Sequence, residues 1–380
     1  MGRTILLKGL HLTLLMGPTV PVPVPGEVLD ALVSAQVTVN ASDRSAFQLQ
    51  FHFSKRSLIS TALLPSGLLD PGLRVILMAT VNGIPNVLMD GIVTRQDVAP
   101  SGQPGLSALT LTGEDITLQM SLVDMTGIMQ FPALSPSNRV NLILAKYAMY
   151  GVVPLVLPSP FEEPTSPTER IFAQRGTDYD YIKGLGTETG YVFYVDPGPV
   201  PGVNIAYWGP EIRVGVPQPA LNVNFDGYSN VESLSFSYNG LQRTQQIALV
   251  QEPTTRVPIP IPVPDLSLLA PPLAVRPAKT MKVAFTGETA RLTPTQALAR
   301  TLGKMKEGAD AITGTGSLDV LRYGSVLKAR GLVGVRGAGL AYDGLYYVKS
   351  VTHTIKPGEY KQQFTLARNG LVSKTPVVVP

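Results

Sequence analysis

A chain of 380 residues is long enough to form about two to three domains with sizeable hydrophobic cores. It contains 36 Gly and 34 Pro, and only 15% of its residues are charged, which favours turns and strands over long helices. The 44% hydrophobic content excludes a disordered chain. The absence of cysteine excludes disulfides, iron–sulfur clusters and thiolate zinc sites, and we predict no cofactor.

The sequence offers little for a metal centre or a membrane span. Its three histidines, His11, His52 and His353, lie far apart, which disfavours an imidazole-based metal site. Prolines interrupt the two most apolar stretches, 5–25 and 257–275, so neither predicts a transmembrane helix. The N-terminus lacks the pattern of a secretion signal. We therefore expect a protein that is made in the cytoplasm and is soluble there.

Charge is distributed unevenly along the chain. Residues 1–275 carry 15 Lys/Arg against 21 Asp/Glu, whereas residues 276–380 carry 16 against 6. The basic residues of the C-terminal third are scattered among Gly and Val and lack the clustered basic and aromatic pattern of a nucleic-acid groove. We interpret this third as a docking face for an acidic protein surface, and we predict no specific nucleic-acid partner.

Residues 1–130 are predicted to form a compact antiparallel β unit. Apolar and polar residues alternate over 47–53 and over 109–113, which is the pattern of strands with one buried face. Two further strands are predicted at 74–81 and 87–95, with a turn-rich hairpin loop at 82–86 between them.

Residues 131–203 are predicted to form a small α/β insertion. Apolar residues at helical spacing indicate one helix over 135–150 and a second over 177–190, each ending at a glycine. A strand follows over 191–195. Helices this short need a sheet to pack on, so the insertion should contain both.

Residues 204–372 are predicted to form a second β domain, followed by a tail at 373–380. Its strands are expected at 204–208, 233–238, 326–335, 346–355 and 360–368. A helix is expected near 294–309, because Thr293, Pro294 and Gln296 form a capping box with proline at the first helical position.

A proline-rich excursion over 252–278 interrupts this second domain. Every second residue of 258–264 is proline, so the run 257–264 must be extended and lie along a surface. It either reaches a neighbouring subunit or serves as an extended linker.

No local motif predicts catalysis. The glycines of 184–190 resemble a dinucleotide loop, but they precede their strand instead of following it. Neighbouring residues on a strand face opposite sides, so adjacent carboxylates cannot act together as acid and base. We interpret the two such pairs, Glu114-Asp115 and Glu162-Glu163, as solvated loop charges.

His353 and the aromatic residues around it are interpreted as packing residues. The strand period places His353 on the same face as Val351 and Ile355, which favours a hydrogen-bonded structural histidine. Cross-strand packing is also the expected role of five neighbouring aromatic residues: Tyr342, Tyr346, Tyr347, Tyr360 and Phe364.

Two segments resemble one known family. Residues 342–370 look like the closing hairpin of the baseplate hub proteins of contractile injection systems, and residues 175–195 resemble the helix-then-strand segment of the same family. The family includes phage late control protein D and the hub part of the VgrG spike of type VI secretion. The positions that fall on its pattern, for which we expect structural roles, are Asp178, Tyr181, Ile182, Leu185, Gly190, Tyr191, Gly344, Tyr347, His353, Tyr360, Phe364, Arg368, Asn369 and Gly370.

The resemblance implies a mainly β fold with two tube-like β-barrel hub domains flanking the small α/β domain. It also implies a non-enzymatic homotrimer with pseudo-sixfold symmetry, which links a hexameric inner tube to a trimeric spike. Only ten residues follow Gly370, so the spike is expected to be a separate chain. Further implied partners are an inner tube or tube-initiator protein and baseplate wedge proteins.

The kind of machine remains open at this level. A phage tail, an R-type bacteriocin, and an extracellular or membrane-anchored injection system all use such hubs, so the chain is expected to end up in a phage-tail-like particle. The alternative is a cell-wall hydrolase or glycan-binding β protein carried by such a particle, which the absence of paired carboxylates and metal ligands disfavours. A nucleic-acid-binding barrel is the third alternative.

Overall fold

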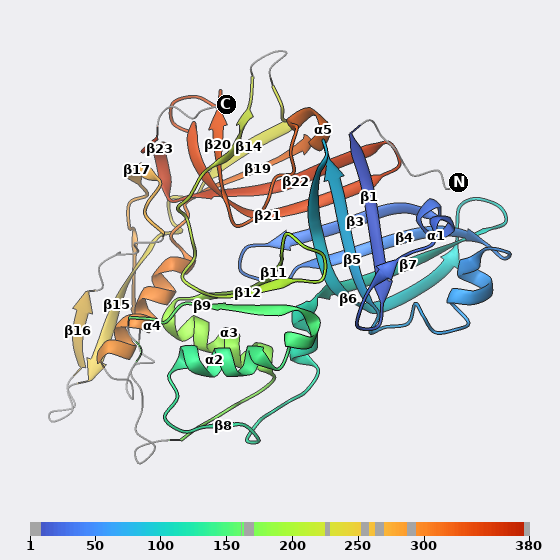
Figure 1. Ribbon diagram of the computed structural model, residues 1–380. Helices are drawn as coiled ribbons and strands as arrows, with labels where there is room; N and C mark the ends of the chain where they lie inside the picture. The colour runs from blue at the N-terminus through green and yellow to red at the C-terminus, as the bar shows by residue number, and fades with distance from the viewer. Residues whose placement is uncertain are drawn as a thin grey trace.

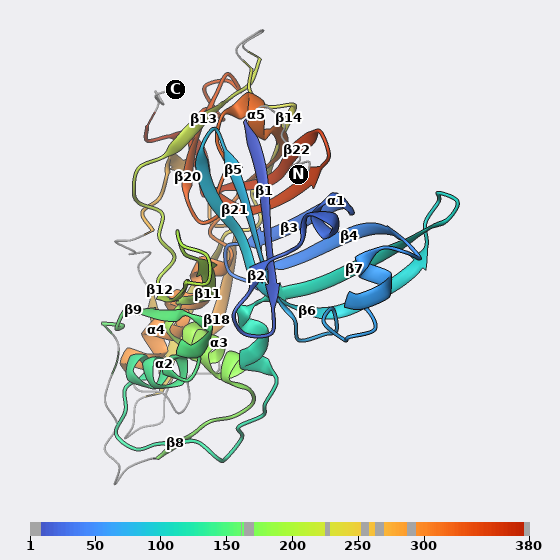
Figure 2. The ribbon, with the colours of Figure 1, turned by 45° about the vertical axis from the view of Figure 1, so that its right-hand side comes forward.

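The computed structural model describes residues 9–160, 162, 171–224, 229–251, 258–262, 270–286 and 294–375. The fold is mainly β, and one large sheet runs through both strand-rich halves (Figures 1 and 2). Its main path is β14 (Ser233–Tyr238), β19 (Ile312–Asp319), β22 (Glu359–Arg368), β21 (Gly344–Lys356), β3 (Leu32–Asn40), β4 (Ala46–Ser54), β7 (Leu106–Asp115), β6 (Ile84–Pro100), β5 (Arg74–Val81), β1 (Leu10–Gly17) and β2 (Val22–Pro23). Off this path, β20 (Leu332–Arg336) joins β21 to β13 (Gln218–Asn222).

The two halves meet where β21 pairs with β3. The ladder is antiparallel and runs from Ser350 opposite Asn40 to Ile355 opposite Ala35. Both halves contribute to one continuous hydrophobic core beneath the sheet. Among the described strands this sheet stays open, with β14 and β2 at its ends, and no closed barrel is present.

The strands of the first half confirm the predicted alternation. Phe47, Leu49, Phe51 and Phe53 are all buried in β4, while the polar residues between them face the other side of the sheet. The strand predicted over 109–113 is part of β7. Period-two alternation was therefore sufficient to assign the core face.

The hairpin between β5 and β6 is tighter than predicted. The expected loop over 82–86 is only two residues long, because Val81 pairs directly with Ile84. Asn82 and Gly83 have φ of 49° and 83°, the left-handed pair of a type I′ turn, which matches the twist of the flanking strands. Residues 84–86 belong to β6, so the predicted loop was too long.

The insertion contains two helices on a three-stranded sheet, as predicted (Figure 1). Ser135 caps α2 (Pro136–Ala145), and Thr177 caps α3 (Asp178–Thr189), each through its hydroxyl. The sheet order is β11 (Val192–Pro197), β12 (Asn204–Gly209) and β9 (Val152–Val156). A two-stranded ribbon of β8 (Gln130–Phe131) and β10 (Phe172–Ala173) completes this part.

The structure corrects the assignment of β12. This strand was expected to open the second β domain, but it pairs with β11 and β9 and lies at the centre of the insertion's sheet. Ala206 and Trp208 bury their side chains in the insertion's own core, which explains the placement. Sequence order alone could not show which of the two neighbouring sheets β12 joins.

Part of the proline-rich excursion joins a separate small sheet. Its order is β16 (Pro258–Pro262), β15 (Thr244–Gln251) and β18 (Lys282–Thr286). The run 258–262 is extended, as predicted, and it pairs with β15 of the same chain. Only Ile259 and Ile261 can donate N–H groups to β15, because proline has none.

The remaining elements are short or pack on these sheets. β17 (Ala274–Pro277) pairs with β23 (Gly370–Ser373), and α4 (Pro294–Glu307) packs against α3 and β15. The expected cap Thr293 lies outside the described residues. The strand predicted over 326–335 is confirmed only as β20, because Arg330 takes a left-handed φ of 65° in the turn before it. The other elements are α1 (Gly26–Asp30), α5 (Val320–Tyr323), η1 (Ile59–Leu63), η2 (Ile116–Ser121) and η3 (Ala148–Tyr150).

A buried ion pair joins the first half of the large sheet to the insertion. Arg74 of β5 donates two hydrogen bonds to Asp90 of β6, at 2.8 Å and 2.7 Å. The same guanidinium donates to the carbonyl of Tyr150, and Asn204 of β12 donates to Asp90 at 2.8 Å. The Asp90 side chain is fully buried and that of Arg74 is 4% exposed.

Asp90→Ala should destabilise the protein by about 3–5 kcal/mol, because it leaves the buried Arg74 cation without its carboxylate. The measurement is the free energy of unfolding from urea titration. Asp97→Ala is the matched control: it breaks the exposed Arg95–Asp97 pair and should cost less than about 1 kcal/mol. Equal losses in the two variants would contradict the prediction.

Candidate functional site

The motif residue Asp178 organises the start of α3. Its carboxylate accepts a hydrogen bond from the Tyr147 hydroxyl at 2.6 Å and from the Gln174 amide at 2.7 Å, and it pairs with Lys146 Nζ at 2.5 Å. Asp178 also lies at the N-terminal, positive end of the helix dipole. Burial, together with the Asp178 carboxylate, raises the pKa of the Tyr147 hydroxyl well above its usual value. The cluster therefore fixes α2, α3 and the preceding loop together.

Four further motif residues build the insertion's core. Ile182 and Leu185 are buried on the inner face of α3. Tyr181 stacks on Phe131 with ring centroids 5.5 Å apart, and Tyr191 meets Trp208 edge to face at 4.9 Å. The Tyr181 contact packs α3 against the ribbon of β8 and β10, and the Trp208 indole N–H donates to the carbonyl of Ile182 in α3.

Two features of the structure require glycine at position 190, at the end of α3. Its φ of 69° lies in the left-handed region that favours glycine. A Cβ here would also lie 2.8 Å from the Cα of Gly303, so α3 and α4 approach closely at this point. Gly190 thus allows α4 to pack closely against α3 of the insertion.

His353 belongs to a buried hydrogen-bond network. Its Nδ1 lies 2.8 Å from the Tyr360 hydroxyl and 3.2 Å from the Gln362 amide nitrogen. Gln362 in turn bonds to both the N–H and the carbonyl of Leu327. Burial lowers the pKa of His353 to about 3, so the ring is neutral and structural.

Three more motif residues pack around the closing hairpin. Gly344 has a φ of 111°, and a Cβ on it would overlap the side chain of Ser373. Tyr347 is buried and carries the Arg213 guanidinium 4.9 Å from its ring centroid. Phe364 is buried in the main core and leaves room only for glycine at position 316 of the neighbouring strand.

The closing Arg368-Asn369-Gly370 element pins distant segments to the C-terminal strands. Arg368 is buried and donates to three backbone carbonyls, those of Gly370, Asp343 and Ala341. The Asn369 side chain accepts from the backbone N–H groups of residues 273 and 274, each at 3.0 Å. A Cβ on Gly370 would overlap the carbonyl oxygen of residue 276. The element therefore holds β17 against β23.

Sequence reasoning missed two buried arginine clusters. Arg213 pairs with Asp310 through two hydrogen bonds, at 2.5 Å and 2.8 Å. Burial disfavours the charged guanidinium, but the hydrogen bonds and negative charge of Asp310 outweigh it and raise the pKa of Arg213. Arg330 pairs with Asp196 and lies 4.0 Å from the ring centroid of Tyr194, which fixes the second half to the insertion. Partners 97 and 134 residues apart gave no local signal.

Glu114 and Asp115 lie in β7 and are not solvated loop charges, which corrects the interpretation drawn from the sequence. Asp115 is buried and accepts from the N–H groups of Ser45 and Thr117, and burial raises its pKa. Glu114 pairs with Arg44 at 3.0 Å. Glu162 accepts from backbone and hydroxyl groups of α2 and its surroundings, while Glu163 lies outside the described residues.

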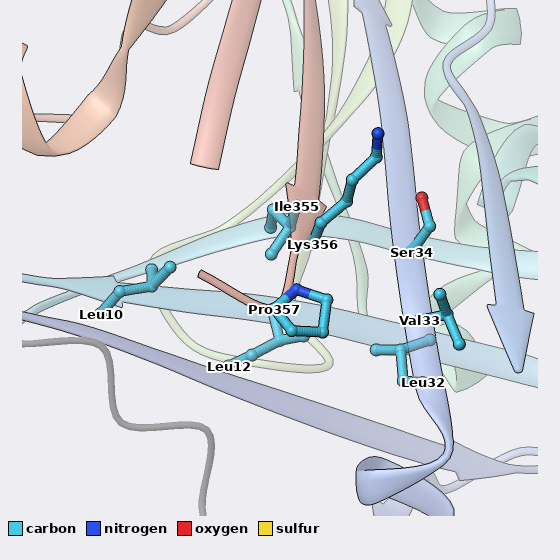
Figure 3. A pocket seen from close by; sticks show the side chains of 8 residues that line it. All are labelled: Leu10, Leu12, Leu32, Val33, Ser34, Ile355, Lys356 and Pro357. Atoms are coloured by element: carbon cyan, nitrogen blue, oxygen red, sulfur yellow. The ribbon is translucent and has the colours of Figure 1, made fainter. Parts of the chain in front are cut away.

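The described residues contain no group of three or more carboxylates and histidines that could hold a metal ion. A cavity of about 20 Å³ lies where β1 and β3 meet the turn after β21, which is room for about one water molecule (Figure 3). Within the same described part of the chain, no helix has the length and apolarity to cross a membrane.

No protein-family model and no curated protein sequence matches this chain. Solved structures do match. A tail protein from Neisseria meningitidis MC58 shares 12% identity with a TM-score of 0.64, over 97% of this chain and 99% of that one. The 43 kDa tail protein of prophage MuSo2 from Shewanella oneidensis shares 12% identity with a TM-score of 0.62, over 95% and 98%.

A third similar structure is the c3393 protein of E. coli, described as a component of the type VI secretion system that resembles the T4 bacteriophage tail proteins gp27 and gp5. It shares 10% identity with a TM-score of 0.52, over 92% of this chain and 76% of that one. At such low identity these similarities establish the fold: the chain has the fold of phage tail proteins and of a type VI secretion component, over nearly its whole length.

Gly190→Ala should destabilise the protein by about 2 kcal/mol or more, because a left-handed residue gains a Cβ and α4 is pushed away. Gly184→Ala in the same helix is the control, since nothing lies within 4 Å of its Cβ position. Alanine there should be neutral or stabilising by up to about 1 kcal/mol. Urea unfolding measures both, and a tolerated Gly190→Ala would refute the close-approach argument.

Acid should destabilise the protein partly through His353. The folded-state pKa of about 3 lies below the unfolded value of 6.5, so the contribution is complete above pH 6.5 and is lost as the pH falls towards 3. The expected loss from this group is about 2 kcal/mol between pH 7 and pH 5. Unfolding free energies of His353→Gln and of the control His52→Gln should show a flatter pH dependence only in the former.

Proposed function

We propose that this protein is the structural hub of a contractile injection machine's baseplate. In this role it is a homotrimer with pseudo-sixfold symmetry that joins a hexameric inner tube to a trimeric spike. The observation that carries the proposal is the fold similarity to phage tail proteins over 97% of the chain. A chain of the Francisella PdpA–VgrG complex is similar as well, with a TM-score of 0.58.

The arrangement of the large sheet supports this proposal. Along the path of the sheet, β14, β19, β22 and β21 lie on one side of the β21–β3 junction, and β3, β4, β7, β6, β5, β1 and β2 lie on the other. Each chain of a trimer would thus supply two strand-rich units, six in all, to face a six-fold tube. We propose that these units are the two tube-like domains, one formed by 1–130 and the other by the part of 204–372 that follows β12, with the insertion, now including β12, on the outside.

The open edges of the sheet support self-assembly. The outer edge of β14 pairs with no other described strand, and β2 covers only Leu15 and Met16 of β1. Unpaired strand edges are a hazard in a monomer and are removed when subunits pair. The buried arginine clusters, which lock the parts of the chain together, also suit a body that transmits force without unfolding.

The role places the protein inside a particle. The hub is assembled in the cytoplasm with an inner tube or tube-initiator protein on one face and a trimeric spike protein on the other. Baseplate wedge proteins surround it. The basic C-terminal region supplies a docking face in this arrangement. Phage tails, R-type bacteriocins and other contractile injection systems all fit this proposal.

The purified chain should have a mass of about 122 kDa, three times 40.6 kDa, in multi-angle light scattering at several concentrations. Electron micrographs of the same sample should show rings with pseudo-sixfold symmetry. A monomer at every concentration, with or without a spike protein, would refute the self-assembling hub. The protein should also release no fragments from purified peptidoglycan, because we propose a non-catalytic role.

A further inference from the structure

The small sheet of β16, β15 and β18 ends in a strand with an exposed apolar row (Figures 1 and 2). β18 pairs with β15 on one side and with no other strand that the structure describes. Met281, just before the strand, and Val283 and Phe285 within it are 67%, 59% and 61% exposed. Alternate residues of a strand share a face, so the edge of β18 presents backbone groups beside an apolar row.

The two edges of the small sheet differ in their capacity to pair with another strand. At one edge, β16 has proline at 258, 260 and 262, three of its five residues, and proline has no N–H to donate. β18, at the other edge, contains no proline, and its register with β15 is continuous from Lys282 to Thr286. Regular edges without proline are the ones to which an extended segment can add.

The charges around the apolar row are basic. Residues 270–286 contain Arg276, Lys279 and Lys282, all exposed, and no Asp or Glu. The adjoining helix α4, which packs against β15, has three Lys/Arg against one Glu. Like charges on neighbouring strands are destabilising and opposite charges are favourable. A second copy of β18 would bring lysine against lysine, whereas an acidic segment would complement this edge.

We propose that β18 binds an extended acidic segment of a partner protein, which adds to the small sheet as a further strand. Backbone hydrogen bonds to the edge supply affinity, and side chains at alternate positions supply selectivity. Apolar residues of the segment cover Val283 and Phe285, and the acidic residues between them lie on the face of Lys282. The inference goes beyond the hub function and does not depend on it, because a single chain carries this edge.

The test measures the binding of three synthetic peptides to the purified full chain by fluorescence anisotropy at low salt. The first peptide alternates valine with glutamate. The second has lysine in place of each glutamate, and the third is the glutamate peptide with its backbone nitrogens methylated, so that it has no N–H to donate. The glutamate peptide should bind, and each of the other two should bind at least about tenfold more weakly.

Substitutions locate the binding edge. Val283→Ser should weaken binding of the glutamate peptide at least about fivefold, because it removes apolar area that the peptide covers. Val98→Ser on β6 is the matched control, since Val98 is 55% exposed on another strand. Lys282→Gln should weaken binding at least about threefold, and Lys55→Gln, at another exposed lysine, is its control. Both controls should bind within about twofold of the native chain, and urea unfolding should show that all four variants are folded.

The outcomes distinguish this proposal from the hub. Absence of binding, or equal binding of the glutamate and lysine peptides, overturns the acidic partner. Undiminished binding of the methylated peptide overturns strand addition. A lower assembly mass in Val283→Ser, measured by light scattering, shows that a second copy covers the edge and also overturns the partner. Failure of the hub appears instead as a monomeric native chain, which still binds the glutamate peptide if the present inference is correct.

Discussion

The antiparallel pairing of β21 with β3 is the contact on which the rest of this structure depends. It joins backbone segments about 300 residues apart, from Ser350 opposite Asn40 to Ile355 opposite Ala35. Two separate sheets would each expose a further row of unpaired N–H and C=O groups, which invites uncontrolled pairing. Their union leaves one sheet with one hydrophobic core on one side. The insertion is held at the same junction, because Arg330 pairs with Asp196 of β11 and also donates to the carbonyls of residues 40 and 41.

Buried arginines fasten the remaining parts of the chain. Arg74, Arg213 and Arg330 each join segments from different parts of the sequence through a carboxylate, and Arg368 does so through three carbonyls. All four also lie over tyrosine rings, with centroid distances of 6.0, 4.9, 4.0 and 4.3 Å. Arginine suits this role better than lysine because its planar guanidinium donates in several directions and stacks on aromatic faces. Although the chain has few charged residues, several of them therefore connect separate segments inside the fold.

The two faces of the large sheet differ in composition. The core face buries Phe47, Leu49 and Phe364. The opposite face carries polar side chains such as Thr38, Gln48 and Thr352. In the proposed role the protein is driven through a target envelope as one unit, so its internal contacts must withstand force. The buried arginine contacts meet this need together with the continuous sheet. Catalytic groups would add nothing to this role.

The sequence by itself determined the local structure. Period-two alternation identified β4 and its buried face, and Thr177 and Gly190 marked the ends of α3, because caps and turns depend on neighbouring residues only. Tertiary structure alone decided that β12 belongs to the insertion, that the proline run pairs with β15, and that Asp115 is buried. It also decided which carboxylate each arginine meets. These outcomes depend on partners in other segments, from 7 residues away for Gln251 and Pro258 to 134 residues away for Asp196 and Arg330. No pattern within one segment encodes the identity of a partner in another.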